Sequence, residues 1–328
     1  MSKRDLEARP VDEKDLGVWD ELARRHGSVF DTVRWTELFR PALRRIGLYD
    51  AGGALRGGFC VYEQRKFGLR ILRNPPCTPQ IGPFHEPKAS NPAARSDEQR
   101  AVGEAMAEFL AAERAPLVSL GLAPACRDCL PFLWRRYKVV PRYTYLVDLT
   151  AGADQIRKNM SASRRNDVSK ATRDGLFVRP AADMREVSEL VRSTFGRQGE
   201  FIAGDHLDSI LFRFADPTNS YAYVVTFEDR VLAACAVVHD ERTAYYLLGG
   251  YRAEDRHHGA GGLAVAAAIQ AAQERGLKTF DFEGSSIPPI ERFFRGFGGQ
   301  LTPYFSIHKA WLPVELALHL HPRFRSRF

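Results

Sequence analysis

The sequence predicts an α/β protein in which two tandem domains each consist of a mixed sheet flanked by helices. Its 328 residues exceed what one ordinary core accommodates and suit two domains of average size. Hydrophobic residues make up 45% and charged residues 27%, so a packed core is expected and extensive disorder is not. Helical and strand-like segments alternate, and we place the boundary near Pro141. The expected domains are residues 1–140, completed by 311–328, and residues 141–310.

The first half begins with two stretches in which apolar residues recur at helical spacing, 16–26 and 33–46. Strand-like runs follow at 58–62 and 69–72, and then a loop at 74–87 that is dense in proline and glycine. An alanine-rich helix is predicted at 96–114, a buried strand at 117–122 and a weaker strand at 139–149.

The second half opens with a basic helix at 152–176 and a further helix at 184–195. Three strands are predicted at 221–227, 231–239 and 243–250, and then a glycine-rich loop leads into an alanine-rich helix at 262–275. Gly276 closes this helix, and a strand follows at 279–283. The remainder combines a glycine-rich turn, an aromatic strand and a basic tail, which we expect to dock on the protein with at most peripheral membrane contact. The similar rhythm of the halves suggests divergent copies of one fold.

Charge and targeting signals limit the partners and the location. The amino-terminal sequence MSKRDLEARPVDEKDLGVWDEL is polar from the start, and no apolar run is long enough to span a membrane. Five cysteines in 328 residues do not form a disulfide framework, so we expect a cytoplasmic protein. A net charge of +7 favours an anionic partner, which charge alone does not distinguish among nucleic acid, phosphorylated cofactor, nucleotide-linked substrate and anionic lipid.

The most specific motif lies between the strand 243–250 and the alanine-rich helix. Arg256, Gly259 and Gly261 fit the pattern R-x-x-G-x-G, and Ala260 and Gly262 lie beside them. Glycines let the backbone approach a pyrophosphate, and the amides and dipole at a helix start favour its negative charge. These five residues are the predicted cofactor-binding loop. The alternative is a glycine-rich turn that simply begins a helix.

This stretch resembles the acyl-CoA-binding motif of the GNAT acyltransferase superfamily. The basic run IRKNMSASRRNDVSKATRDGLFV, the strand pair YYLLGG and TFDFEG, and the ending ERFFRGFGG are similar to its FemAB-like branch, which includes peptidoglycan aminoacyltransferases. The resemblance covers roughly residues 140–310 and implies tandem GNAT-like domains, with the acceptor in a cleft near their junction. It implies an acceptor amine that attacks an activated acyl group directly, without a covalent enzyme intermediate.

Members of this family use either acyl-CoA or aminoacyl-tRNA as donor. We favour acyl-CoA, as acetyl-CoA or a longer thioester, because the glycine loop fits and the chain lacks the coiled-coil insertion of some tRNA-using members. The acceptor is expected to be a primary amine on a small molecule or on a nucleotide- or lipid-linked compound. The alternatives are an aminoacyl-tRNA-dependent transferase and a non-catalytic binding module. No DNA partner is expected.

One position departs from the family. Relatives often carry lysine in an F-K-R-G-F-G-G ending, where this chain has Phe294. In peptidyl-transferring relatives this lysine is a candidate for stabilising the developing oxyanion. Its absence counts against a peptidoglycan role, and Arg292 or Arg295 are the candidates to replace it.

An acidic strand face supplies the candidate base. Asp281 and Glu283 are two residues apart and are predicted to share one face of the strand 279–283. A carboxylate beside the acyl site can take the proton that the attacking amine loses, and Glu283 is the preferred candidate. Tyr246 is a candidate acid for the leaving thiolate. The alternative makes Asp281 a hydrogen-bond acceptor, Glu283 a solvated side chain and Tyr246 a core residue.

The basic helix supplies the candidate acceptor-binding residues. Arg164 and Arg165 are chosen because the helix lies near the expected domain junction, where it could contact an anionic acceptor or tRNA phosphates. The alternative is an ordinary solvated face. No metal site is expected, because Cys126 and Cys129 have zinc-like spacing without a second ligand pair.

Overall fold

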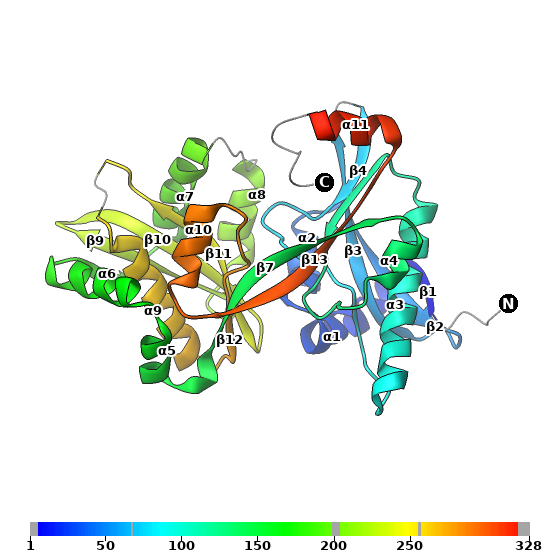
Figure 1. The fold of residues 1–328 in the computed structure, drawn as a ribbon, viewed down its shortest axis with the longest axis horizontal. Helices are drawn as coiled ribbons and strands as arrows, with labels where there is room; N and C mark the ends of the chain where they lie inside the picture. Colours follow the sequence, from blue (N-terminus) through cyan, green and yellow to red (C-terminus); the bar gives the residue numbers. More distant parts are fainter. Residues whose placement is uncertain (1–5, 67, 199–203, 255–256, 321–328) are drawn as a thin grey trace. The chain divides into compact units, whose positions relative to one another are not determined.

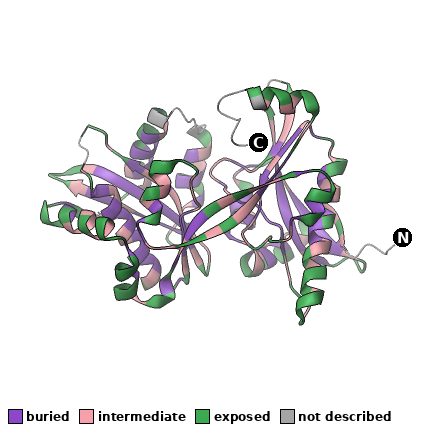
Figure 2. Ribbon diagram, viewed as in Figure 1, coloured by how far each residue is buried: buried purple, intermediate pink, exposed green. Residues whose placement is uncertain are grey.

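The computed structural model describes residues 6–66, 68–198, 204–254 and 257–320. The chain divides into two compact units: unit 1 comprises Met1–Arg142 and Pro303–Phe328, and unit 2 comprises Tyr143–Thr302. Each unit is an α/β layer structure with a mixed sheet and helices on its faces, so the predicted fold class is confirmed (Figure 1). Buried residues concentrate on the strands and on the helix faces that pack against them (Figure 2).

Unit 1 contains strands in the order β1-β2-β3-β4-β6-β13, in which β4 and β6 are parallel and the other neighbours antiparallel. Its elements are β1 (Leu6–Pro10), η1 (Glu13–Asp15), α1 (Leu16–His26), η2 (Val29–Asp31), α2 (Val33–Glu37), β2 (Leu43–Asp50), β3 (Leu55–Lys66), β4 (Leu69–Arg73), β5 (Phe84–His85), α3 (Pro92–Ala112), β6 (Leu117–Gly121) and α4 (Leu130–Trp134). The strands β7 (Lys138–Asp148) and β13 (Gln300–Ala310) each contain a unit boundary, and α11 (Leu312–Leu320) follows β13.

Side chains alternate across β3, which places a helix on each face of the unit 1 sheet. Phe59 packs edge to face on Phe109 of α3, at a centroid distance of 5.6 Å. The neighbouring Gly58 faces the other way, where a Cβ would lie 2.2 Å from the ring of Trp19 in α1. The close approach of α1 to the sheet therefore requires glycine at position 58.

Unit 2 contains strands in the order β7-β12-β11-β10-β9-β8, in which only β11 and β12 form a parallel pair among the described pairings. Its elements are η3 (Leu149–Ala151), α5 (Ala153–Asn159), α6 (Ala162–Arg173), β8 (Phe177–Pro180), α7 (Met184–Gln198), α8 (Gly204–Asp208), η4 (Ser209–Phe214), β9 (Ser220–Phe227), β10 (Arg230–His239), β11 (Thr243–Tyr251), α9 (Ala260–Glu274), β12 (Thr279–Asp281) and α10 (Pro288–Arg295).

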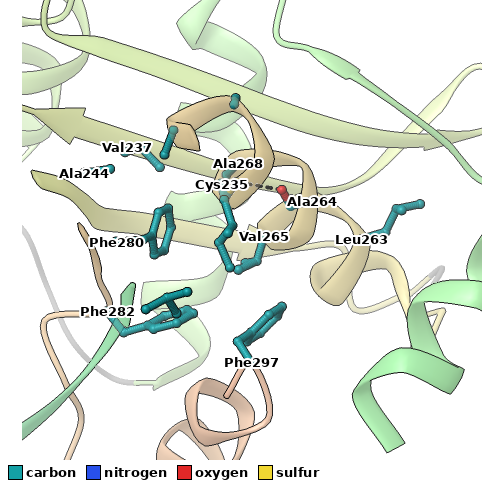
Figure 3. Packing of buried hydrophobic residues seen from close by; sticks show 14 of the residues in the cluster. Cys235, Val237, Ala244, Leu263, Ala264, Val265, Ala268, Phe280, Phe282 and Phe297 are labelled. Carbon is teal, nitrogen blue, oxygen red and sulfur yellow. Dashed lines mark hydrogen bonds between the residues drawn. The ribbon is translucent and has the colours of Figure 1, made fainter. Parts of the chain in front are cut away.

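The alanine-rich helix α9 is the centre of the unit 2 core (Figure 3). Its small side chains let it lie close to the sheet, and Cys235 of β10 donates its thiol hydrogen to the Ala264 carbonyl at 3.4 Å. Phe280 and Phe282 fill the space beyond its alanines (Figure 3). The helix ends before Gly276, whose positive φ of 76° closes it as predicted.

The two units share most of their element order. Starting from β1 and from β8, each has a strand, helical segments, three antiparallel strands, a long helix, a parallel strand and a short helix, whereas α5 and α6 precede β8 in unit 2 and β5 is an additional strand in unit 1. The sixth strand of each sheet comes from elsewhere: β13 pairs with β6 in unit 1, and β7 pairs with β12 in unit 2. The chain therefore exchanges the last strands of two similar repeats.

Several predicted elements differ from the structure. The helix expected over 33–46 ends at Glu37, because Pro41 cannot supply the backbone N–H that a continuing helix needs, and the chain then forms β2. The basic helix divides into α5 and α6, since Met160 and Ser161 are extended and the Ser161 hydroxyl accepts a hydrogen bond from the Arg164 N–H as an N-cap. The helix α10 was not predicted. No helix among the described residues is long and apolar enough to cross a membrane.

Candidate active site

The candidate site lies where two parallel strands of unit 2 separate. The strands β11 and β12 pair over three residues only, from Thr243↔Thr279 to Tyr245↔Asp281. Beyond that point β11 continues to Tyr251 without β12 beside it. On its other side β11 pairs with β10, and the register of that pairing shifts between Ala236 and Val237 of β10. The ends of the two strands form a fork in which side chains, rather than a continuing ladder of hydrogen bonds, line the space.

Asp281 is the last paired residue of β12 and is buried. Its Oδ1 accepts a hydrogen bond from the Thr144 hydroxyl of β7 at 2.5 Å and a second from the Glu283 backbone N–H at 2.7 Å. Burial raises the pKa of Asp281 to about 6, and these two hydrogen bonds oppose the rise. The carboxyl is therefore held in a fixed orientation and shapes the backbone that follows it.

Glu283 does not continue the strand as predicted, because β12 ends at Asp281. Its φ of 56° is left-handed and the next residue, Gly284, has a φ of 75°, so the chain turns away from the sheet here. The Oε1 atom of Glu283 is buried. Burial raises its pKa well above the ordinary value and the nearby Asp281 charge adds to the rise, which makes the ionised carboxylate a stronger base.

An aromatic cluster separates the ends of the two strands. Phe294 of α10 stacks on Phe282 at 4.8 Å and meets the Tyr246 ring of β11 edge to face at 5.5 Å. Phe294 is buried, and its ring contacts residues on both sides of the fork. Burial raises the pKa of Tyr246 above its ordinary value, which weakens this phenol as an acid.

The glycine-rich turn packs closely against α6. A Cβ on Gly259, the N-cap of α9, would lie 2.2 Å from the Asp167 carbonyl oxygen. A Cβ on Gly262 would lie 3.0 Å from a guanidinium nitrogen of Arg164, and Ala260 is buried. Gly261 differs, because a Cβ there would meet only the Phe293 ring at 3.9 Å. Gly259 therefore lets the α6 backbone approach, Gly262 lies against the Arg164 side chain, and Gly261 has space beside it. The remaining predicted residue of the loop, Arg256, lies outside the described residues.

Arg164 extends from α6 into the same region. Its guanidinium lies over the Phe293 ring at 4.3 Å and over the Phe297 ring at 5.0 Å, and it pairs with Asp167 at 3.4 Å. Its Nε is buried and makes no hydrogen bond to any described residue. Burial lowers the pKa of Arg164. The positive charge of Arg164 therefore lies beside the positive end of the α9 dipole, and its carboxylate partner is Asp167.

The other predicted arginines lie elsewhere. Arg165 donates hydrogen bonds to the carbonyls of Lys158, at 3.0 Å, and Met160, and so caps the end of α5. Arg295 pairs with Glu291 at 3.2 Å, and its side chain is exposed. Arg292 is also exposed on α10. The structure therefore brings Asp281, Glu283 and Tyr246 to one fork and Arg164 to the glycine turn, whereas these three arginines point to other surroundings.

The sequence patterns did not identify some residues of the fork. Thr144 holds Asp281, and the Tyr145 hydroxyl donates to Glu291 of α10 at 2.6 Å. Their partners are more than a hundred positions away, so no local pattern identifies them. The two prolines that begin α10 at Pro288 did carry a readable signal, since proline is favoured in a first helical turn. His257 connects the end of α6 to the start of α9. Its Nε2 lies 3.0 Å from the Asp174 carboxylate after α6, and its Nδ1 accepts a hydrogen bond from the N–H of Gly259, the N-cap of α9.

The corresponding fork of unit 1 is closed by the loop that follows β4. The strands β4 and β6 also pair over three residues, from Ile71↔Leu117 to Arg73↔Ser119. Beyond them the Asn74 side chain exchanges two hydrogen bonds with Gly121, and the Ile81 N–H donates to the Gly121 carbonyl at 3.1 Å. The proline-rich loop predicted at 74–87 thus continues the edge of β6. Among the described residues of either unit, no acidic, histidine or cysteine cluster is arranged to hold a metal ion.

The contrast between Gly259 and Gly261 predicts opposite effects on stability. Gly259→Ala is expected to lower the free energy of unfolding by about 2 kcal/mol, because its Cβ would push against the α6 backbone. Gly261→Ala has room and improves helix propensity, so it is expected to raise stability by about 0.5 kcal/mol. Urea denaturation followed by circular dichroism measures both. Equal losses in the two variants would contradict the packing role of Gly259.

The buried Asp281 predicts a pH-dependent stability. Its raised pKa means that the folded state binds the proton more tightly, so its contribution is full below about pH 4 and is lost as the pH rises through about 6. Asp281→Asn keeps an oxygen that can accept the two hydrogen bonds but does not titrate. The pH-dependent contribution of Asp281 to the free energy of unfolding, up to about 3 kcal/mol, is therefore absent in the variant. We expect the stability of the variant relative to wild type to increase between pH 4 and pH 7 in urea denaturation. Parallel curves for the two proteins would rule this out.

Comparisons with known proteins place these features in a family. Residues 155–295 match the family model described as an acetyltransferase (GNAT) domain. Among curated proteins no significant match is found. The crystal structure of FemX is similar over 95% of this chain and 99% of its own, with 13% identity and a TM-score of 0.68.

Two further solved structures have the same fold. The C-terminal domain of a putative lysylphosphatidylglycerol synthetase from Agrobacterium fabrum covers 93% of this chain and 95% of its own, with 14% identity and a TM-score of 0.59. The structure of L-PGS from Bacillus licheniformis covers 94% and 96%, with 12% identity and a TM-score of 0.56. Residues 155–295 of this chain are therefore a GNAT acetyltransferase domain in a fold shared with FemX, and the protein is an acyltransferase.

Proposed function

We propose that unit 2 transfers an acyl group from a coenzyme A thioester to a primary amine. The observation that carries the proposal is the fork between β11 and β12, which ends in two carboxyls with raised pKa inside a domain that matches the GNAT acetyltransferases. In this reaction the amine nitrogen forms a bond to the acyl carbon while the bond from carbon to sulfur breaks. The amine proton passes to a base, and the thiolate leaves.

The residues of the fork have distinct proposed roles. Glu283 takes the proton from the amine, and Asp281 fixes the Glu283 backbone through its hydrogen bond to that N–H. Tyr246 lines the fork beside Phe282 rather than donating a proton, because its pKa is raised. Arg164 and the amides of the first α9 turn supply positive potential for the donor's pyrophosphate beside Gly261.

Donor binding tests the first part of this proposal. Gly261→Glu places a negative charge where the pyrophosphate is expected, so the affinity for acetyl-CoA should fall more than tenfold in calorimetric titration. Gly261→Gln has nearly the same bulk without the charge, and its affinity should fall less. Absence of acetyl-CoA binding to the wild type, or equal losses in the two variants, would overturn the proposed pyrophosphate site.

The role of Glu283 as base predicts a selective loss of turnover. Glu283→Gln should reduce kcat by about a hundredfold or more, while acetyl-CoA still binds with wild-type affinity. Release of free CoA thiol in the presence of a panel of primary amines measures the rate. Glu274→Gln, at the far end of α9, is the matched control and should retain full activity. An unchanged kcat in the Glu283 variant would exclude the carboxylate as base.

Aminoacyl-tRNA is the second candidate donor, because α6 covers Gly259 and Gly262 and leaves limited room at the glycine turn. The exposed Arg157, Lys158 and Arg173 on α5 and α6 could contact tRNA phosphates. In that case the acyl group would be an aminoacyl ester, and binding should weaken steeply with salt. Filter binding of aminoacylated and deacylated tRNA over a salt series distinguishes this donor from acetyl-CoA.

A further inference from the structure

The helix α11 exposes an apolar face that the acyltransferase site does not use. The residues Trp311, Leu312, Leu316 and Leu320 are 55%, 70%, 56% and 84% exposed. The three leucines are spaced four residues apart, so they lie along one side of the helix. We name these four residues the α11 face. Side chains this large and this exposed, aligned in a row, are unusual on a surface that meets only water.

Two contacts hold α11 to the rest of unit 1. The Trp311 N–H donates to the Pro116 carbonyl at 2.9 Å, and Glu315 forms an ion pair with Lys138 at the start of β7. These contacts fix the helix at its amino-terminal end and engage its acidic side chain. The α11 face therefore lies exposed on an anchored helix, and Figure 2 colours much of α11 as exposed.

Cationic residues lie next to this helix. The Lys309 ammonium, two residues before Trp311, donates to the Arg135 carbonyl at 2.8 Å and so brings the end of α4 beside the base of α11. Arg135 and Arg136 are exposed there, together with Trp134, which is 58% exposed. In sequence, α11 is followed by HPRFRSRF, which contains Arg323, Arg325 and Arg327 and no acidic residue.

We propose that the α11 face, with the flanking cations, binds the surface of a bilayer that contains anionic lipids. Leucines insert into the acyl boundary, tryptophan favours the headgroup level, and arginines attract lipid phosphates. The helix has nine residues. Such a helix is about 14 Å long, half the hydrocarbon thickness of about 30 Å, so it suits a position in the plane of the interface. A row of leucines beside cations fits an anionic membrane better than a neutral protein groove.

Vesicle co-sedimentation tests the proposal. The wild type should sediment with vesicles of phosphatidylcholine containing a third phosphatidylglycerol, and binding to pure phosphatidylcholine should be at least about tenfold weaker. The variant Leu312→Ser/Leu316→Ser should lose at least about tenfold in affinity for the anionic vesicles. The charge variant Arg135→Glu/Arg136→Glu should also bind the anionic vesicles more weakly. Added salt should reduce the difference in affinity between this variant and the wild type.

A matched variant controls for the loss of exposed apolar residues. Phe177 and Phe212 of unit 2 are 64% and 47% exposed, so Phe177→Ser/Phe212→Ser removes a similar surface and should bind vesicles as wild type does. The proposal is wrong if wild type does not sediment, if it binds neutral vesicles equally well, or if the leucine variant binds unchanged. It is also wrong if light scattering shows a wild-type dimer that the leucine variant abolishes while no vesicles bind.

Discussion

The early end of the parallel pairing between β11 and β12 is the constraint on which the candidate site depends. After Asp281 the chain cannot follow β11, because Glu283 and Gly284 adopt positive φ and turn it away. Gly284 is required there, since a Cβ would lie 2.0 Å from the Tyr143 carbonyl oxygen of β7. The turn gives the Asp281 carboxyl one hydrogen bond, from the Glu283 N–H, beside the one that Thr144 of β7 donates, and it leaves Glu283 at the end of the fork. The positions of the two carboxyls therefore depend on this backbone turn, and burial raises the pKa of both.

The two units use the same short pairing in different ways. In unit 1 the loop after β4 hydrogen-bonds to Gly121 through the Asn74 side chain and the Ile81 N–H, so this loop closes the space beyond the parallel pairing. In unit 2 the rings of Tyr246, Phe282 and Phe294 occupy it. Side chains can change rotamer without breaking backbone hydrogen bonds, whereas a hydrogen-bonded loop can move only if those bonds break. This difference supports assigning the chemistry to unit 2.

The sequence identified the elements whose signals are local. The helix at 16–26 and the strands near 231–239 and 243–250 were read correctly, because apolar spacing and turn residues mark them. The helix over 33–46 was wrong, since its apolar pattern continued past Pro41 into a buried strand. The spacing of Asp281 and Glu283 predicted two carboxyls on one face of a strand; the strand ends at Asp281 instead, and a backbone hydrogen bond from Glu283 to Asp281 keeps the two residues adjacent. Thr144, and the packing of α6 on Gly259, depend on contacts between distant segments that no local pattern contains.

The exchange of β7 and β13 has a consequence for how the chain is made. Strand β6 pairs with β13, whose residues leave the ribosome almost two hundred positions later. Until then unit 1 has the edge of β6 uncovered, and an uncovered edge is a template for pairing with other chains. The pairing of β7 with β12 does not wait in this way, because β7 is synthesised before β12. The pairing of β6 is complete only when β13 arrives, so the amino-terminal repeat needs protection of that edge during synthesis.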